Sequence, residues 1–286
     1  MTKEQRSSAC KWPDWSSAHQ FFGPVKKPLE IYIFVDPACS SCWKNEMLIK
    51  RLQIEYGHYF SIKHVLCGDS SFSEQNDVQD VHAIRAGSNV NNWLKDPKLS
   101  DYVTSIAVKA AELQGKKAGN RFFKKIQESF FLDKRNIAQL DTLLDCAEQA
   151  ELDYDEFLKD IKSESAVKAL QCDLKIKSEM EVNEVPTFVF FNQKIDEEGL
   201  KVPGYYPYEI YVEILEDILG FEPQANPLPS LTEYMEEHQI VNSQELSFLY
   251  DLDANEIERE MKKLVLKRTV DKIDTPQGIY WKLKKE

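Results

Sequence analysis

The sequence contains no long hydrophobic run. Within its 286 residues, no stretch approaches the roughly eighteen apolar residues that are needed to cross a bilayer. The first fifteen residues, MTKEQRSSACKWPDW, lack the apolar core of a secretory signal peptide. We therefore expect a cytoplasmic protein that does not partner with a membrane.

The sequence also has few cysteines and no excess of positive charge. The chain has six cysteines, and in the cytoplasm we expect them to be mostly reduced, without a structural disulfide framework. The formal net charge is −12, which disfavours binding to nucleic acid and to anionic membranes, because both are polyanions. This charge suits a protein whose partners are basic or neutral.

Apolar residues, in contrast, are abundant enough for a sizeable core. They make up 42% of the chain, and aromatic residues make up 11%, which indicates a globular protein of one large or two ordinary domains. Composition and periodicity divide the chain into a flexible N-terminal arm, a large domain, a proline-rich linker and a small C-terminal domain. The predicted bounds are 1–28, 29–220, 221–230 and 231–286.

The large domain shows alternating strand and helix patterns. The order is strand, helix, strand, helical block, strand, strand and helix. These elements are expected at residues 28–36, 41–57, 59–67, 100–180, 185–192, 194–202 and 206–220. Residues 68–98 are predicted to be a long loop, and Gly115 and Gly119 are predicted to interrupt the helical block.

Two cysteines follow the first predicted strand in a CxxC motif. Cys39 would stand at the beginning of a helix, where unpaired backbone N–H groups and the helix dipole favour a thiolate. A thiolate is the nucleophile in disulfide exchange, and Cys42, one short turn away, could resolve the mixed disulfide. About 145 residues later, Val185 and Pro186 open another predicted strand.

This combination of motifs and element order resembles the thioredoxin superfamily, in particular its DsbA-like branch with a helical insertion at about 100–180. The residues that carry the resemblance are Cys39-Ser40-Ser41-Cys42 after a strand and Val185-Pro186-Thr187 before one. The resemblance implies an α/β, thioredoxin-like fold in which Pro186 is a cis-proline that faces the dithiol.

Other interpretations of the cysteine pair remain open. The Ser-Ser between Cys39 and Cys42 differs from the residues typical of strong oxidoreductases, and no carboxylate can be assigned as their buried proton acceptor. The pair could therefore be a relic on a fold with another function. A structural zinc site usually needs four ligands, and the chain has no second CxxC, so we expect neither a metal nor a cofactor.

The last segment, 231–286, does not fit a thioredoxin fold. Its pattern of a short helix, two further helices and a hairpin is typical of a winged helix-turn-helix. From Phe221 onward, however, 13 acidic residues stand against 9 basic ones, and the predicted recognition helix begins with the acidic stretch ANEIERE. The charge favours a protein-docking module over a DNA-binding one.

Over nearly its whole length the chain is similar to the SpxH (YjbH) family. The similarity rests on stretches such as KKPLEIYIFVDPACSSCW, AVKAAELQGKKAG and GYYPYEIYVEIL, together with the winged-helix-like tail. Membership would imply an adaptor that binds the transcriptional regulator Spx and promotes its degradation by the ClpXP protease. Our first hypothesis is such an adaptor, without enzymatic activity and with thiols that are accessory.

The dithiol face is a natural surface for such a partner, because the backbone beside a cis-proline can pair with an extended segment. Trp43, Val185, Tyr205 and Tyr206 are candidate contact residues there, since aromatic side chains often anchor interfaces. Core packing is the alternative for each of them. The alternative function is a cytosolic thiol-disulfide oxidoreductase that uses Cys39 and Cys42.

Overall fold

The computed structural model describes residues 27–68, 97–192, 199–238, 240–275 and 278–284. The predicted arm at 1–28 and the predicted loop at 68–98 therefore lie almost wholly outside the described residues. Within the described ranges, no helix combines the length and the apolar character that a membrane span requires.

A four-stranded sheet forms the centre of the larger unit, with strand order β2-β1-β3-β4 in the described part of the chain. The strands are β1 (Leu29–Val35), β2 (Phe60–Leu66), β3 (Thr187–Asn192) and β4 (Leu200–Pro203). β1 pairs in parallel with β2, and the β1–β3 and β3–β4 pairs are antiparallel. The first three strands confirm the prediction. β4 begins later than the predicted strand at 194–202, of which residues 194–198 lie outside the described residues.

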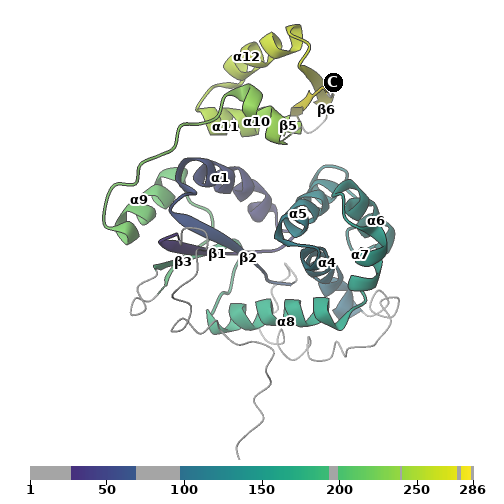
Figure 1. The fold of residues 1–286 in the computed structure, drawn as a ribbon. Helices are drawn as coiled ribbons and strands as arrows, with labels where there is room; N and C mark the ends of the chain where they lie inside the picture. Colours follow the sequence, from purple (N-terminus) through teal and green to yellow (C-terminus); the bar gives the residue numbers. More distant parts are fainter. Residues whose placement is uncertain (1–26, 69–96, 193–198, 239, 276–277, 285–286) are drawn as a thin grey trace, which may run out of the picture.

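Helices cover both faces of this sheet. α1 and α9 lie over one face, α8 runs along the other, and α4 to α7 form a helical insertion beside the sheet (Figure 1). The helices are α1 (Ser40–Tyr56), α4 (Pro97–Leu113), α5 (Lys116–Phe131), α6 (Leu140–Gln149), α7 (Tyr154–Asp160), α8 (Glu164–Glu179) and α9 (Tyr208–Leu219). This arrangement is the thioredoxin-like fold of the DsbA type, as expected.

β1 is buried on both of its faces, which explains its nearly continuous apolar sequence. Ile31 and Ile33 point into the main core, which they share with α1 and α9. Tyr32 and Phe34 point to the opposite face and pack with residues of α8 and β3. The sheet therefore holds α1, and the cysteines at its beginning, in a fixed position.

The two glycines predicted to interrupt the helical block behave differently. Gly115 separates α4 from α5 with a φ of 118°, a conformation that favours glycine. Gly119, in contrast, lies inside α5, so the predicted break is wrong there. A Cβ at Gly119 would come within 2.4 Å of the Cγ of Glu112, so glycine is needed for the close approach of α5 to α4.

The C-terminal segment, residues 231–284, has its own hydrophobic core around the fully buried Trp281. Its three-stranded sheet has the order β5-β7-β6. The Trp281 indole N–H donates to Ser243 Oγ over 2.8 Å, and Asp253 begins α12 with a capping box. The elements are α10 (Leu231–His238), β5 (Ile240–Asn242), α11 (Ser243–Tyr250), α12 (Ala254–Leu266), β6 (Val270–Thr275) and β7 (Gly278–Leu283).

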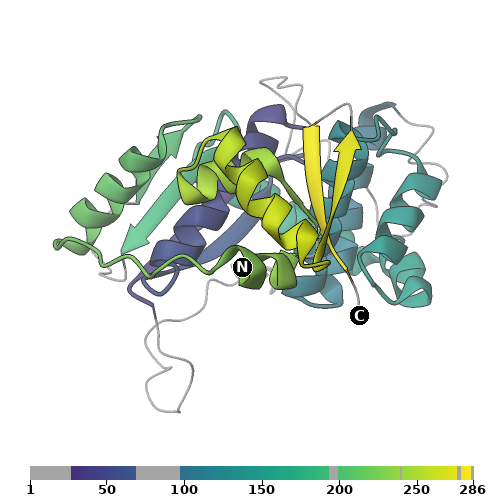
Figure 2. The same cartoon turned by 90° about the horizontal axis from the view of Figure 1, so that it is seen from above.

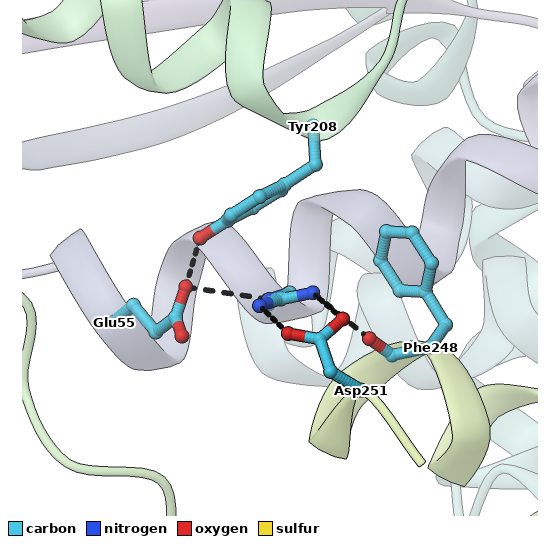
Figure 3. Close-up of polar contacts among 5 residues, drawn as sticks. Glu55, Tyr208, Phe248 and Asp251 are labelled. Carbon is cyan, nitrogen blue, oxygen red and sulfur yellow. Dashed lines mark hydrogen bonds and ion pairs between the residues drawn. The ribbon is translucent and has the colours of Figure 1, made fainter. Parts of the chain in front are cut away.

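Arg51 of α1 connects the larger unit to the C-terminal segment by hydrogen bonds to Phe248 and Asp251, which are labelled in Figure 3. Its guanidinium contacts both carboxylate oxygens of Asp251, at 2.6 and 3.0 Å, and donates to the carbonyl oxygen of Phe248 over 3.0 Å. It also lies 4.4 Å from the centre of the Tyr208 ring, and Tyr208 donates its hydroxyl hydrogen to Glu55. The helix that carries the dithiol is thus also the helix on which α11 rests.

Candidate functional site: the dithiol and the cis-proline

A tight turn between β1 and α1 places Cys39 at the beginning of the helix. The Asp36 carboxylate accepts a hydrogen bond from the Ala38 N–H over 2.8 Å, and the Asp36 carbonyl accepts from the Cys39 N–H over 3.2 Å. Cys39 itself is the N-cap of α1, with extended backbone. Its Sγ accepts a hydrogen bond from the Cys42 N–H over 3.1 Å, so the sulfur occupies the place of a capping oxygen.

The two thiols are free and differ in environment. Cys39 is half-buried, whereas Cys42 is only 4% exposed. Hydrogen bonds from the Cys42 thiol and from the backbone N–H groups of Cys42 and Ser41 lower the pKa of the Cys39 thiol to about 6, against the opposing effect of burial. The hydrogen bond to Cys39, followed by burial, raises the pKa of the Cys42 thiol. The pair therefore has one nucleophilic and one protonated sulfur.

The strand that carries the proline lies against Cys39. The Val185–Pro186 peptide bond is cis. The Cys39 thiol is 3.7 Å from the carbonyl oxygen of Val185, within hydrogen-bonding range for sulfur. The structure thus brings Cys39, Cys42, Val185 and Pro186 together, although they come from distant parts of the sequence.

The aromatic candidates occupy two different places. Tyr205 and Tyr206 are 55% and 40% exposed and follow Gly204, whose N–H donates to the Pro186 carbonyl over 2.8 Å. Tyr205 and Tyr206 are therefore the two residues that follow Gly204, which is hydrogen-bonded to Pro186. Trp43 lies instead toward the helical insertion, where its ring stacks on Phe131 of α5 with centroids 5.6 Å apart.

Sequence reasoning missed a buried carboxylate beside the cysteines. Asp36 is 4% exposed. The hydrogen bond to Cys39 and then burial raise the pKa of Cys42, whereas a backbone hydrogen bond with Asp36 lowers it and the Asp36 charge makes the smallest contribution that raises it. The sequence signal that could have identified Asp36 was its position, directly after a buried strand and three residues before Cys39. With this acid next to a buried thiol, the site has the chemical parts of a thiol-disulfide exchange centre.

Within the described residues, no group of three or more His, Cys, Asp or Glu side chains is arranged to hold a metal ion. Of the cysteines in the described residues, Cys39, Cys42, Cys67 and Cys146 are free thiols and Cys172 takes part in a disulfide, so most of them are reduced.

Comparison with known proteins agrees with this description. The family model described as thioredoxin matches residues 32–213. Among solved structures, a candidate protein disulfide isomerase from Nitrosomonas europaea has a TM-score of 0.52 at 17% identity, covering 68% of this chain and 98% of its own. One described as a probable DsbA oxidoreductase from Streptomyces coelicolor has a TM-score of 0.50 at 14% identity, covering 71% and 94%. At these identities the likeness shows the fold alone.

Curated relatives extend the similarity beyond the thioredoxin-like unit. The ClpXP adapter protein SpxH of Halalkalibacterium halodurans is 44% identical over 90% of this chain and 89% of its own length. The protein of the same name from Bacillus subtilis is 44% identical over 91% of both chains.

The fold and the dithiol define a thioredoxin-like protein of the DsbA class. Within this class, the similarity over nine-tenths of the chain is more specific, because a match of that length must continue past residue 213, where the thioredoxin match ends, into the C-terminal segment. The chain belongs to the SpxH family.

Proposed function

We propose that this protein is an adaptor that binds the regulator Spx and promotes its degradation by the ClpXP protease. The observation that carries the proposal is the 44% identity to SpxH of Bacillus subtilis over 91% of both chains. A match over 91% of the chain leaves out about 26 residues, so it includes more than half of the predicted small domain at 231–286 as well as most of the predicted large domain at 29–220. We infer that both domains, joined by the linker at 221–230, contribute to adaptor function.

The surface chemistry supports a protein partner in the cytoplasm. The net charge of −12 would attract a basic client and repel nucleic acid and anionic membrane. Tyr205 and Tyr206 stand exposed beside the proline strand, where they are available to anchor a client segment. Val185 lies at the same place beside Cys39, whereas Trp43 lies toward the helical insertion, where its ring stacks on Phe131.

Reconstitution tests this proposal. Spx is incubated with ClpXP and ATP, with or without the adaptor, and the loss of Spx is followed over time. We expect the adaptor to accelerate Spx loss and to leave unchanged a ClpXP substrate that needs no adaptor. Equal rates of Spx loss with and without the protein would contradict the proposal.

A second candidate function is thiol-disulfide exchange, which the thiol environments favour. The pKa of the Cys39 thiol is lowered to about 6 and Cys42 is buried behind it, so the pair could attack and then resolve a disulfide. Insulin reduction with dithiothreitol as electron donor tests this activity, with Cys39→Ser as the control. A rate equal to that of the control would reject the second function.

A further inference from the structure

A second polar contact joins the C-terminal segment to the larger unit, next to the contact that Arg51 makes. Lys50 of α1 forms an ion pair with Glu245 of α11 over 2.8 Å. The Glu245 carboxylate also accepts a hydrogen bond from the Tyr234 hydroxyl of α10. Seen from above, the C-terminal segment lies across α1 and reaches toward the insertion helices (Figure 2). α10 and α11 therefore meet α1 through one shared carboxylate.

A histidine belongs to the same contact. His238, the last residue of α10, stacks its ring on Tyr234 with the ring centroids 4.2 Å apart. The ring is partly buried, and Lys50 of α1 and Lys124 of α5 lie close enough to oppose its protonation. His238 is part of the C-terminal segment, whereas both lysines are part of the larger unit. A charge on the histidine ring therefore acts across the junction between the two units.

The nearest buried carboxylate at this junction already has two partners. Only 13% of the Glu245 side chain is exposed, and its oxygens contact Lys50 and Tyr234. Within the described part of the chain, His238 itself forms no ion pair. A proton on the ring would thus place a positive charge in a partly buried position without a carboxylate bonded to it, which costs free energy.

The surroundings of His238 contain groups of both signs, and their effects differ in size. Burial, followed by the charge of Lys50 and then that of Lys124, lowers the pKa of His238. Glu245 and Glu237 act in the opposite direction, as does the C-terminal end of the α10 dipole, but they do not outweigh it. The charged and titratable groups around the ring are Lys50 and Glu46 of α1, Lys124 of α5, Tyr234 and Glu237 of α10, and Glu245 of α11.

We propose that His238 makes the junction between the two units sensitive to pH, so that the C-terminal segment is held less tightly on α1 when the ring gains a proton. The protonated ring is better solvated when His238 has left the junction. The pKa of His238 is below its ordinary value of 6.5, so the contact is strongest above that pH. Its stabilising effect is lost as the pH falls below 6.5, because the separated state then binds the proton more tightly.

Histidine NMR tests the proton affinity of His238 directly. The full-length protein is labelled with [13C]histidine, and the ring signal of His238 is followed from about pH 8 to about pH 4.5. The signal is assigned by its absence in His238→Gln. We expect a midpoint below 6.5, and Lys124→Gln should raise this midpoint by at least about 0.3 of a pH unit. Lys117→Gln, which changes an exposed lysine two turns earlier on α5, is the matched control and should leave the midpoint unchanged.

Urea unfolding tests whether proton uptake weakens the structure. The midpoint is measured at about pH 7.5 and about pH 5.5 for the unmodified protein, His238→Gln and Lys124→Gln. Cys39 and His64 also have shifted pKa values, but all three proteins keep them, so the comparison isolates His238. We expect the unmodified protein to lose most, His238→Gln to lose least, and Lys124→Gln to lie between them.

Two results would overturn the proposal. One is a His238 midpoint at or above 6.5, or a midpoint that Lys124→Gln leaves unchanged. The other is an equal loss of the urea midpoint at low pH in the unmodified protein and in His238→Gln. If His238→Gln does not fold, the titration with Lys124→Gln still decides, because the His238 signal can then be assigned from its contact with the Tyr234 ring.

Discussion

Replacement of Arg51 by alanine should loosen the C-terminal segment from the larger unit. The Arg51 side chain is 12% exposed and donates to the Asp251 carboxylate and to the carbonyl oxygen of Phe248. Hydrogen bonds that involve a charged group each contribute about 1.5–3 kcal/mol, and the contact with the Tyr208 ring adds about 0.5–1 kcal/mol. Asp251 is 73% exposed, so its share of the pair is reduced by solvent screening. We therefore expect the variant to lose about 2–4 kcal/mol of interaction between the two units.

Two assays report on this interaction. Urea unfolding followed by tryptophan fluorescence should begin at a lower urea concentration, and limited proteolysis should cut the linker at 221–230 faster. Arg135→Ala is the matched control, because Arg135 forms an ion pair of the same 2.6 Å length with Asp145 on the surface. Its urea midpoint should stay close to that of the unmodified protein, because exposed ion pairs contribute little to stability. If Arg51→Ala behaves like this control in both assays, α1 does not hold the C-terminal segment as described.

The remaining predictions concern the thiols and a buried ion pair. Because the pKa of Cys39 is lowered to about 6, its alkylation rate should reach half of its maximum near pH 6, and Cys42→Ala should move this point upward. Folding favours the Cys39 thiolate, so the reduced protein should become more stable as pH rises from about 6 to about 8.5, and urea midpoints of Cys39→Ser should lack this rise. The Lys109 side chain is 5% exposed and lies 2.6 Å from Asp173. Replacing Lys109 by methionine should lower the free energy of unfolding by about 3–5 kcal/mol, because it leaves the buried Asp173 carboxylate unpaired. Asp173→Asn in the same chain should restore most of that loss in urea unfolding, whereas an unrestored double variant would contradict a charge-based cost.

Local patterns were sufficient to predict most of the thioredoxin-like unit. The apolar run of β1 and the helical spacing after Cys42 depend on neighbours within one element, and the structure confirms both. The cis bond before Pro186 followed from the family resemblance and is present. The interruption at Gly115 is a local property of backbone conformation and was also predictable.

Features that depend on packing between distant segments were not predictable. Gly119 reads as a helix break until α4 is placed against it, and then its missing side chain is a packing requirement. Asp36 reads as an ordinary turn residue until its burial beside Cys42 is known. Trp43 and Ile273 line one pocket although 230 residues separate them in the sequence (273 − 43), so no local pattern could reveal it. The winged-helix-like character of residues 231–286 stays a prediction.

The central claim is that this chain captures a client protein and that its thiols are accessory. The most direct measurement is the rate at which ClpXP degrades Spx with the Cys39→Ser/Cys42→Ser variant in place of the unmodified adaptor. The account predicts a rate within about twofold of the unmodified protein, because the docking surfaces consist of other side chains. A correctly folded double variant that no longer promotes degradation would contradict it.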